Sequence, residues 1–123
     1  MQNDRLKFKD EFKGRVYRFA LDIIGFVERL PKGQVSRIIS DQLLRSATSI
    51  GANVVEAQGA GSRKDYTNFF AYALKSANET KFWLGLLRDS GKSEGEATNK
   101  LLREVTEIAN ILAASILTLK GKK

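Results

Sequence analysis

The sequence predicts an all-α protein, an antiparallel four-helix bundle with up-down-up-down topology and a left-handed twist. Apolar residues recur at alternating steps of four and three along four long segments, the spacing of amphipathic helices. Proline occurs only once, glycines cluster between the segments, and no stretch alternates apolar and polar residues as a half-buried strand would. A chain of 123 residues suits one domain with one core.

The first two helices are predicted at residues 8–30 and 34–58. The core positions of the first are Phe12, Val16, Phe19, Ile23, Phe26 and Leu30. The sequence LPKG at 30–33 ends this helix, because proline and glycine interrupt helical structure. The core positions of the second are Ile39, Leu43, Leu44, Ala47, Ile50 and Val54. Gly59 is a candidate C-cap residue for this second helix.

The other two helices are predicted at residues 63–90 and 94–120. Ser62 with Asp65, and Ser93 with Glu96, have the spacing of capping boxes at the two starts. The third helix ends at Gly91, and its core positions are Tyr66, Phe70, Ala73, Ala77, Leu84 and Leu87. The core positions of the fourth are Leu101, Val105, Ile108, Leu112, Ser115 and Leu119.

The connections between these helices are short, so each helix must run antiparallel to its sequence neighbour. Both termini and the turn at 59–62 therefore fall at one end of the bundle. The alternation of four and three favours shallow crossing angles and a left-handed supercoil.

The second helix carries small residues on two faces. Ala47 and Gly51 lie towards the core and allow close approach of a neighbouring helix. A separate stripe on the opposite side contains Arg45, Ser49, Ala52 and Glu56. The small members of this stripe leave room for a second neighbour, which can belong to another subunit.

The third helix also has apolar residues away from its core stripe. With Leu84 in the core, Phe82 and Leu86 point outwards, and Tyr72 lies on the flank. Exposed apolar patches mark interfaces, although single exposed apolar side chains are common. The predicted subunit interface consists of Arg45, Ser49, Ala52, Asn53, Glu56, Tyr72, Phe82 and Leu86.

Within this interface, Glu56 has two interpretations. On a surface helix it is a solvated carboxylate, with Asn53 making a local hydrogen bond. If assembly covers the face, Glu56 needs a donor, because an unpaired buried carboxylate is costly. Arg45, from the same or a neighbouring chain, is the candidate donor.

The excess positive charge gathers at the end that holds the termini. The formal net charge is +7. Nine basic residues are expected there against three acidic ones, while residues 22–42 and 85–104 at the other end carry seven of each sign. The predicted nucleic-acid-binding residues are Lys7, Lys9, Lys13, Arg15, Arg63, Lys64, Lys120, Lys122 and Lys123. Phosphates could bind there without sequence readout, and the plainer alternative is that the lysines serve solubility.

Composition argues against an enzyme. The chain has neither histidine nor cysteine, which removes the usual nucleophile–base pairs, disulfides and the histidines of di-metal bundles. We therefore expect no catalytic residues, no metal site and no cofactor. The stretch GAG at 59–61 lacks the context of a phosphate-binding loop. No apolar run suggests a membrane span or a secretory signal, so we expect a cytoplasmic protein without membrane contact.

The stretch RSATSIGANVVEAQGAGSRKDYTNFFAYALKSANETKFWLGLL, residues 45–87, resembles a known family. It is similar to the four-helix bundles encoded by intervening sequences of bacterial large-subunit ribosomal RNA genes. The likeness is strongest over SIGANVVEA (49–57) and ETKFWLGLL (79–87). The Asn-x-x-Glu element of the family falls on Asn53 and Glu56, whereas its following glycine is replaced by Ala57.

This resemblance implies a homopentamer without a settled biochemical activity. A related branch, the accessory proteins of diversity-generating retroelements, consists of basic pentamers that bind nucleic acid and a reverse transcriptase. Two functions are therefore expected as alternatives. The first is RNA or DNA binding by a non-enzymatic homo-oligomer, and the alternative is a protein-interaction scaffold, for example for a polymerase.

Overall fold

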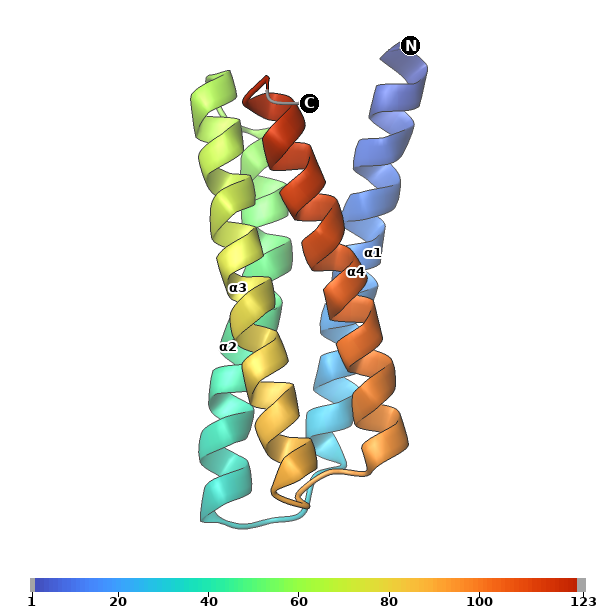
Figure 1. The fold of residues 1–123 in the computed structure, drawn as a ribbon, viewed down its shortest axis with the longest axis vertical. Helices are drawn as coiled ribbons and strands as arrows, with labels where there is room; N and C mark the ends of the chain where they lie inside the picture. Colours follow the sequence, from blue (N-terminus) through green and yellow to red (C-terminus); the bar gives the residue numbers. More distant parts are fainter. Residues whose placement is uncertain (1, 122–123) are drawn as a thin grey trace.

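Residues 2–121 are described in a computed structural model and form four helices joined by short connections. The helices are α1 (Gln2–Glu28), α2 (Gln34–Gln58), α3 (Arg63–Asp89) and α4 (Gly95–Leu119). Each runs antiparallel to the next, and both termini lie beside the α2–α3 turn at one end (Figure 1). We call this the terminal end; the connections 29–33 and 90–94 form the opposite end. The predicted fold class is confirmed.

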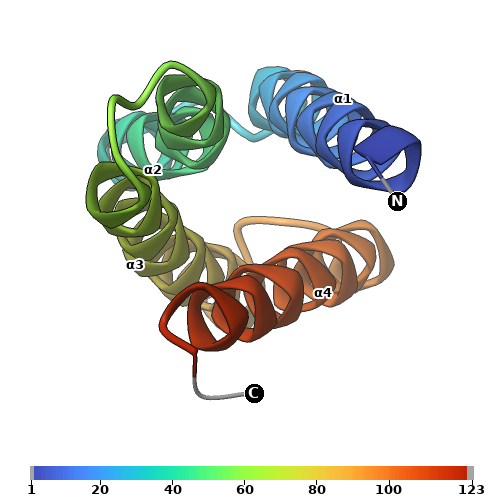
Figure 2. The same cartoon turned by 90° about the horizontal axis from the view of Figure 1, so that it is seen from above.

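The core lies along the bundle axis, where the predicted stripes meet. Seen from above, the four helices stand around this axis in chain order (Figure 2). Contact is most extensive between α2 and α3 and least between α1 and α4. Each large apolar side chain buried here contributes about 1.5–3 kcal/mol. The largest fully buried apolar residues are Phe19, Ile23, Leu43, Ile50, Leu84, Leu87, Ile108 and Leu112.

The first helix is longer at its start than predicted. It begins at Gln2 instead of residue 8, which adds residues 2–7, and Phe8 at the predicted start stacks on Phe12, one turn further along. Apolar spacing does not mark this extension, because Leu6 lies largely outside the core, with 52% of its surface exposed. The helix ends at Glu28, two residues early.

The two predicted capping boxes have different outcomes. Ser62 is the N-cap of α3, and its hydroxyl accepts the Asp65 N–H at 3.0 Å, as predicted. The box at Ser93 is wrong. The N-cap of α4 is Glu94, whose carboxylate accepts the N–H groups of Glu96 at 2.7 Å and Ala97 at 2.9 Å. A carboxylate satisfies two backbone donors at the positive end of the helix, whereas a hydroxyl satisfies one.

Two glycines end helices in different ways. Gly91 has a φ of 76° and follows the last residues of α3. The N–H groups of Gly91 and Lys92 bond back to the carbonyls of Arg88 and Leu87, at 3.1 and 2.9 Å. This is a Schellman motif, which favours glycine in the left-handed position. Gly59 is the C-cap of α2, as predicted, but its φ of −94° suits most residues.

The small residues of α2 face other helices of the same chain. An added Cβ on Gly51 would lie 3.7 Å from a methyl of Val16, so Gly51 lies against α1. Ser46, fully buried, lies 2.9 Å from the Thr80 hydroxyl of α3. Ser49 bonds the Ser76 hydroxyl at 3.0 Å. Ser49 therefore leaves room for α3, not only for another subunit.

Candidate nucleic-acid interface

Three segments distant in sequence meet at the terminal end (Figure 1), and each of them carries basic residues. They are the first half of α1, the start of α3 and the end of α4. The described predicted binding residues that lie here are Lys7, Lys9, Lys13, Arg63, Lys64 and Lys120. Lys122 and Lys123 lie outside the described residues. The three acidic residues counted against them are Asp10, Glu11 and Asp65.

Arg15 does not extend this basic surface. Its guanidinium bonds both carboxylate oxygens of Glu104 on α4, at 2.7 and 2.8 Å, and reaches Glu107 at 3.2 Å. These hydrogen bonds raise the pKa of Arg15 and, from the other side, lower the pKa of Glu104. The charge of Arg15 is therefore compensated within the fold, and this residue joins α1 to α4.

Arg63 combines an exposed position with a structural role. Its Nε donates to the carbonyl of Leu119 at 2.9 Å, one of the unpaired carbonyls at the end of α4. A cation at this position also complements the negative end of the α4 dipole. Lys7 lies 4.0 Å from Glu11, but both side chains are mostly exposed, so this pair is weak.

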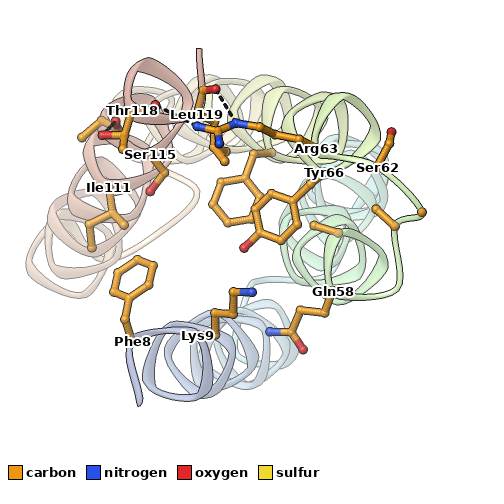
Figure 3. Close-up of a pocket in the computed structure, with 15 residues that line it drawn as sticks. Phe8, Lys9, Gln58, Ser62, Arg63, Tyr66, Ile111, Ser115, Thr118 and Leu119 are labelled. Carbon is orange, nitrogen blue, oxygen red and sulfur yellow. Dashed lines mark hydrogen bonds between the residues drawn. The ribbon is translucent and has the colours of Figure 1, made fainter. Parts of the chain in front are cut away.

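A cavity of about 780 Å³ opens beside these cations, between the start of α1 and the end of α4. Figure 3 shows Phe8, Lys9 and Gln58 on one side of it, and Ile111 and Ser115 on another. Tyr66 projects into it from α3. Residues from all four helices line the cavity. The cavity was not predicted from the sequence. Ser115, a small polar residue at a predicted core position, indicates that this part of the core is not filled by a large side chain.

An aromatic row runs from this cavity into the core. Phe8 stacks on Phe12 with 5.8 Å between centroids, and Tyr66 stacks on Phe70 with 4.9 Å. Phe12 and Phe70 are buried and 6.2 Å apart. The Lys9 ammonium lies over the Tyr66 ring, 5.3 Å from its centroid. The inner rings support the outer two, Phe8 and Tyr66, at the cavity.

A second surface consists of exposed apolar residues of α3. Tyr72, Phe82 and Leu86 expose 55%, 58% and 38% of their surfaces. Phe82 packs edge-on against Trp83, with 5.0 Å between the ring centroids. These exposures agree with the predicted outward orientation of Phe82 and Leu86.

Arg45 has a partner on α3 that sequence analysis missed. Its guanidinium bonds Glu79, and the same carboxylate oxygen accepts the Trp83 indole N–H at 3.0 Å. The Trp83 bond, followed by the charge of Arg45, lowers the pKa of Glu79. Spacing could have suggested half of this cluster, because Glu79 and Trp83 are four residues apart on one helix face.

The remaining predicted interface residues of α2 are exposed or bonded locally. Asn53 donates to the Ser49 carbonyl at 2.9 Å, the local bond that was one of its two interpretations. Ala52 and Glu56 are exposed. Within residues 2–121, no ion pair or hydrogen bond holds the Glu56 carboxylate. The prediction that Arg45 of the same chain pairs with Glu56 is therefore wrong, since Arg45 bonds Glu79.

Over residues 2–121, no three or more aspartates and glutamates gather where they could hold a metal ion. None of the helices described there is long and apolar enough to cross a bilayer.

Residues 11–114, which hold all of α2 and α3 and most of α1 and α4, match the 23S rRNA-intervening sequence protein family. The chain belongs to this family. A similar solved structure is a crystal structure of a protein of unknown function from the S23 ribosomal protein family of Bacteroides thetaiotaomicron. It shares 39% identity with a TM-score of 0.80, and the match covers 85% of this chain and 97% of that one. No curated protein matches the chain.

Proposed function

We propose that this family member is a non-enzymatic, cytoplasmic homo-oligomer that binds RNA or DNA through phosphate contacts at its terminal end. The observation that carries the proposal is that α1, the start of α3 and the end of α4 meet at that end, where they bring lysines together with Arg63. The opposite end has equal numbers of basic and acidic residues. The charge of the protein is thus concentrated on one end.

Phosphate binding needs this kind of surface and little more. Each phosphate neutralised by a lysine or arginine releases condensed counterions, so affinity falls as salt rises. Contacts to the backbone fix the position of the nucleic acid without reading its sequence. Lys7, Lys64 and Lys120 are exposed, so their ammonium groups can reach an irregular backbone. We therefore expect binding that tolerates many sequences and depends steeply on salt.

Assembly would multiply this surface. In a ring with parallel subunit axes, five terminal ends would form one basic face. Exposed Tyr72, Phe82 and Leu86 offer the apolar area that such an interface buries. Light scattering should give the mass of an oligomer for the wild type and smaller particles for Phe82→Ser combined with Leu86→Ser. A monomeric wild type at micromolar concentration would contradict the assembly.

The same apolar face supports the second candidate, a scaffold for another protein. Exposed aromatic and aliphatic side chains are common in protein-binding surfaces. If the wild type is monomeric and binds no nucleic acid, this face becomes the main functional surface, and its partner is a different protein.

The nucleic-acid proposal is tested by two charge reversals of equal size. One changes Lys7, Lys9 and Lys13 to glutamate at the terminal end. Its matched control changes three exposed lysines of the opposite end, Lys32, Lys92 and Lys100. Fluorescence anisotropy with a labelled single strand at low salt measures affinity, and circular dichroism checks helicity.

The first variant should lose most binding, and its log–log salt slope should fall by about two units, since each lost contact removes about 0.7. The control should stay close to the wild type. Equal loss in both variants, or no binding by the wild type at low salt, would contradict the proposal.

A further inference from the structure

The cavity at the terminal end is large enough for a ligand group. Its volume of about 780 Å³ lies within the usual range for small-molecule sites. Buried Ala57 and Phe70 are among its lining residues. Phe8, Tyr66 and Ile111 reach it from three different helices (Figure 3). This cavity is therefore an apolar groove that leads from the basic surface towards the core, and it is called the groove below.

The aromatic rings of this groove are held in place. Phe8 and Tyr66 each stack on a buried ring, Phe12 and Phe70, so their planes are fixed before a ligand arrives. Flat apolar ligands stack on such rings. The side chain of Tyr17 on α1 is more exposed, at 67%, but does not line the cavity.

Polar groups accompany the rings. Lys9, Gln58 and Ser115 line the cavity and provide an ammonium, an amide and a hydroxyl group. The Tyr66 hydroxyl is protonated at neutral pH, as tyrosines ordinarily are, and burial raises its pKa further, so it can donate a hydrogen bond. A nucleobase presents both acceptors and donors at its edges, together with a flat face for stacking.

The surrounding charge favours a polyanion over a single acid. A fatty acid needs one cation at the mouth of an apolar pocket. Here the segments that carry Lys7, Lys13, Lys64 and Lys120 lie at the same end as Lys9, so several cations accompany the cavity. A chain of phosphates with attached bases matches both the several lysines and the aromatic groove.

We propose that this groove receives an unstacked base of single-stranded RNA or DNA while the neighbouring lysines hold the flanking phosphates. The inference rests on the proposed nucleic-acid binding and specifies the form of nucleic acid that is bound. The bases of a duplex are paired and stacked, so they cannot enter the groove without unpairing. The protein should therefore prefer single strands to a duplex of the same sequence and length.

The test measures affinity for a single strand, for its duplex, and for the same strand with abasic positions. Phe8→Ala and Tyr66→Leu remove the stacking rings, and Ser115→Phe fills the groove without removing a ring. Tyr17→Ala is the matched control, because Tyr17 is an exposed aromatic residue of α1 that does not line the cavity. All variants are compared as full chains in anisotropy titrations at one salt concentration.

Each groove variant should bind the intact single strand about tenfold more weakly, the size expected for the loss of base stacking. Duplex binding and the salt slope should change little, and the wild type should lose a similar factor on the abasic strand. The Tyr17→Ala control should keep wild-type affinity. A loss of fold in Tyr66→Leu would leave Phe8→Ala and Ser115→Phe to decide.

The outcomes separate the two proposals. If the wild type binds neither single strand nor duplex at low salt, the proposed function fails, and the groove inference fails with it. If it binds both equally, or if the groove variants keep the wild-type preference, only the inference is overturned. Saturable binding of dodecanoate that Ser115→Phe abolishes, with equal affinity for single strand and duplex, would assign the groove to an apolar acid instead.

Discussion

Two helix–helix contacts of this bundle, called here the α2–α3 seam and the α1–α4 seam, are packed in opposite ways. Between α2 and α3, small side chains let the helices meet along their length, and hydroxyl pairs such as Ser46 with Thr80 cross the seam. Between α1 and α4, contact is sparse, and Arg15 joins the helices to Glu104. The cavity at the terminal end opens beside this second seam.

The difference shows how side-chain size divides structural and binding roles. A seam of serine, alanine and threonine leaves no space for a ligand. Its buried polar atoms are satisfied, since no buried side-chain nitrogen or oxygen among the described side chains lacks a partner. The looser seam keeps aromatic rings and cations accessible. The first holds the fold, and the second carries the proposed binding surface.

The largest contrast should come from placing the same side chain in both seams. Ser46→Leu forces a bulky group against Thr80, where the hydroxyl groups are 2.9 Å apart, and should destabilise the protein by about 3 kcal/mol. Ser115→Leu enters the open cavity and should be neutral or slightly stabilising, because leucine favours helices. Urea denaturation measures both, and equal destabilisation would mean that the two seams are packed alike.

A smaller contrast is expected between the ion pairs of the seams. Glu104→Gln weakens the bidentate bond to Arg15, whose side chain is 30% exposed, and should cost about 1–2 kcal/mol. Glu79→Gln weakens the bond to Arg45, which is 56% exposed, and should cost about 0.5–1 kcal/mol. Thermal unfolding of the two variants in low and high salt provides the comparison. A larger cost at Glu79 would show that α2–α3 depends on charge more than on close packing.

These observations also show which features are readable from one sequence. The core stripes and turns were predicted because they depend on spacing within a single helix. The bonds from Arg15 to Glu104 and from Arg45 to Glu79 join residues far apart in sequence. A helical wheel places Arg15 on a face but does not show which helix faces it. Arg15 was therefore assigned to phosphate binding, whereas the fold uses its charge.

The groove was missed for a related reason. Its shape depends on the position of α1 relative to α4, and Phe8 lies at the predicted first residue of α1, outside the predicted core positions. The N-cap of α4 was misplaced by one residue, because Ser93 and Glu94 both precede a helix start with suitable acceptors. In each case the local pattern allowed two geometries, and three-dimensional contacts select one.

The smallest effect we predict is a change in pH dependence. Arg15 lowers the pKa of Glu104 below its ordinary value of 4.5, so the folded state favours the carboxylate. This stabilisation is present above pH 4.5 and is lost as the pH falls through the lowered folded pKa. Glu104→Gln should reduce the loss of stability between neutral and acidic pH. An unchanged stability profile from urea denaturation at several pH values would show that the Arg15 bond does not matter in solution.

Hydrogen–deuterium exchange with and without a single-stranded oligonucleotide tests the central claim, that the terminal end of the looser seam binds nucleic acid. At low salt, binding should slow exchange in residues 6–13, 57–66 and 111–120, the segments that hold the basic residues and the groove. Exchange in residues 34–45 and 85–95 at the opposite end should stay unchanged. Slower exchange confined to the opposite end or to the exposed α3 face, in a protein that binds the oligonucleotide, would contradict the claim.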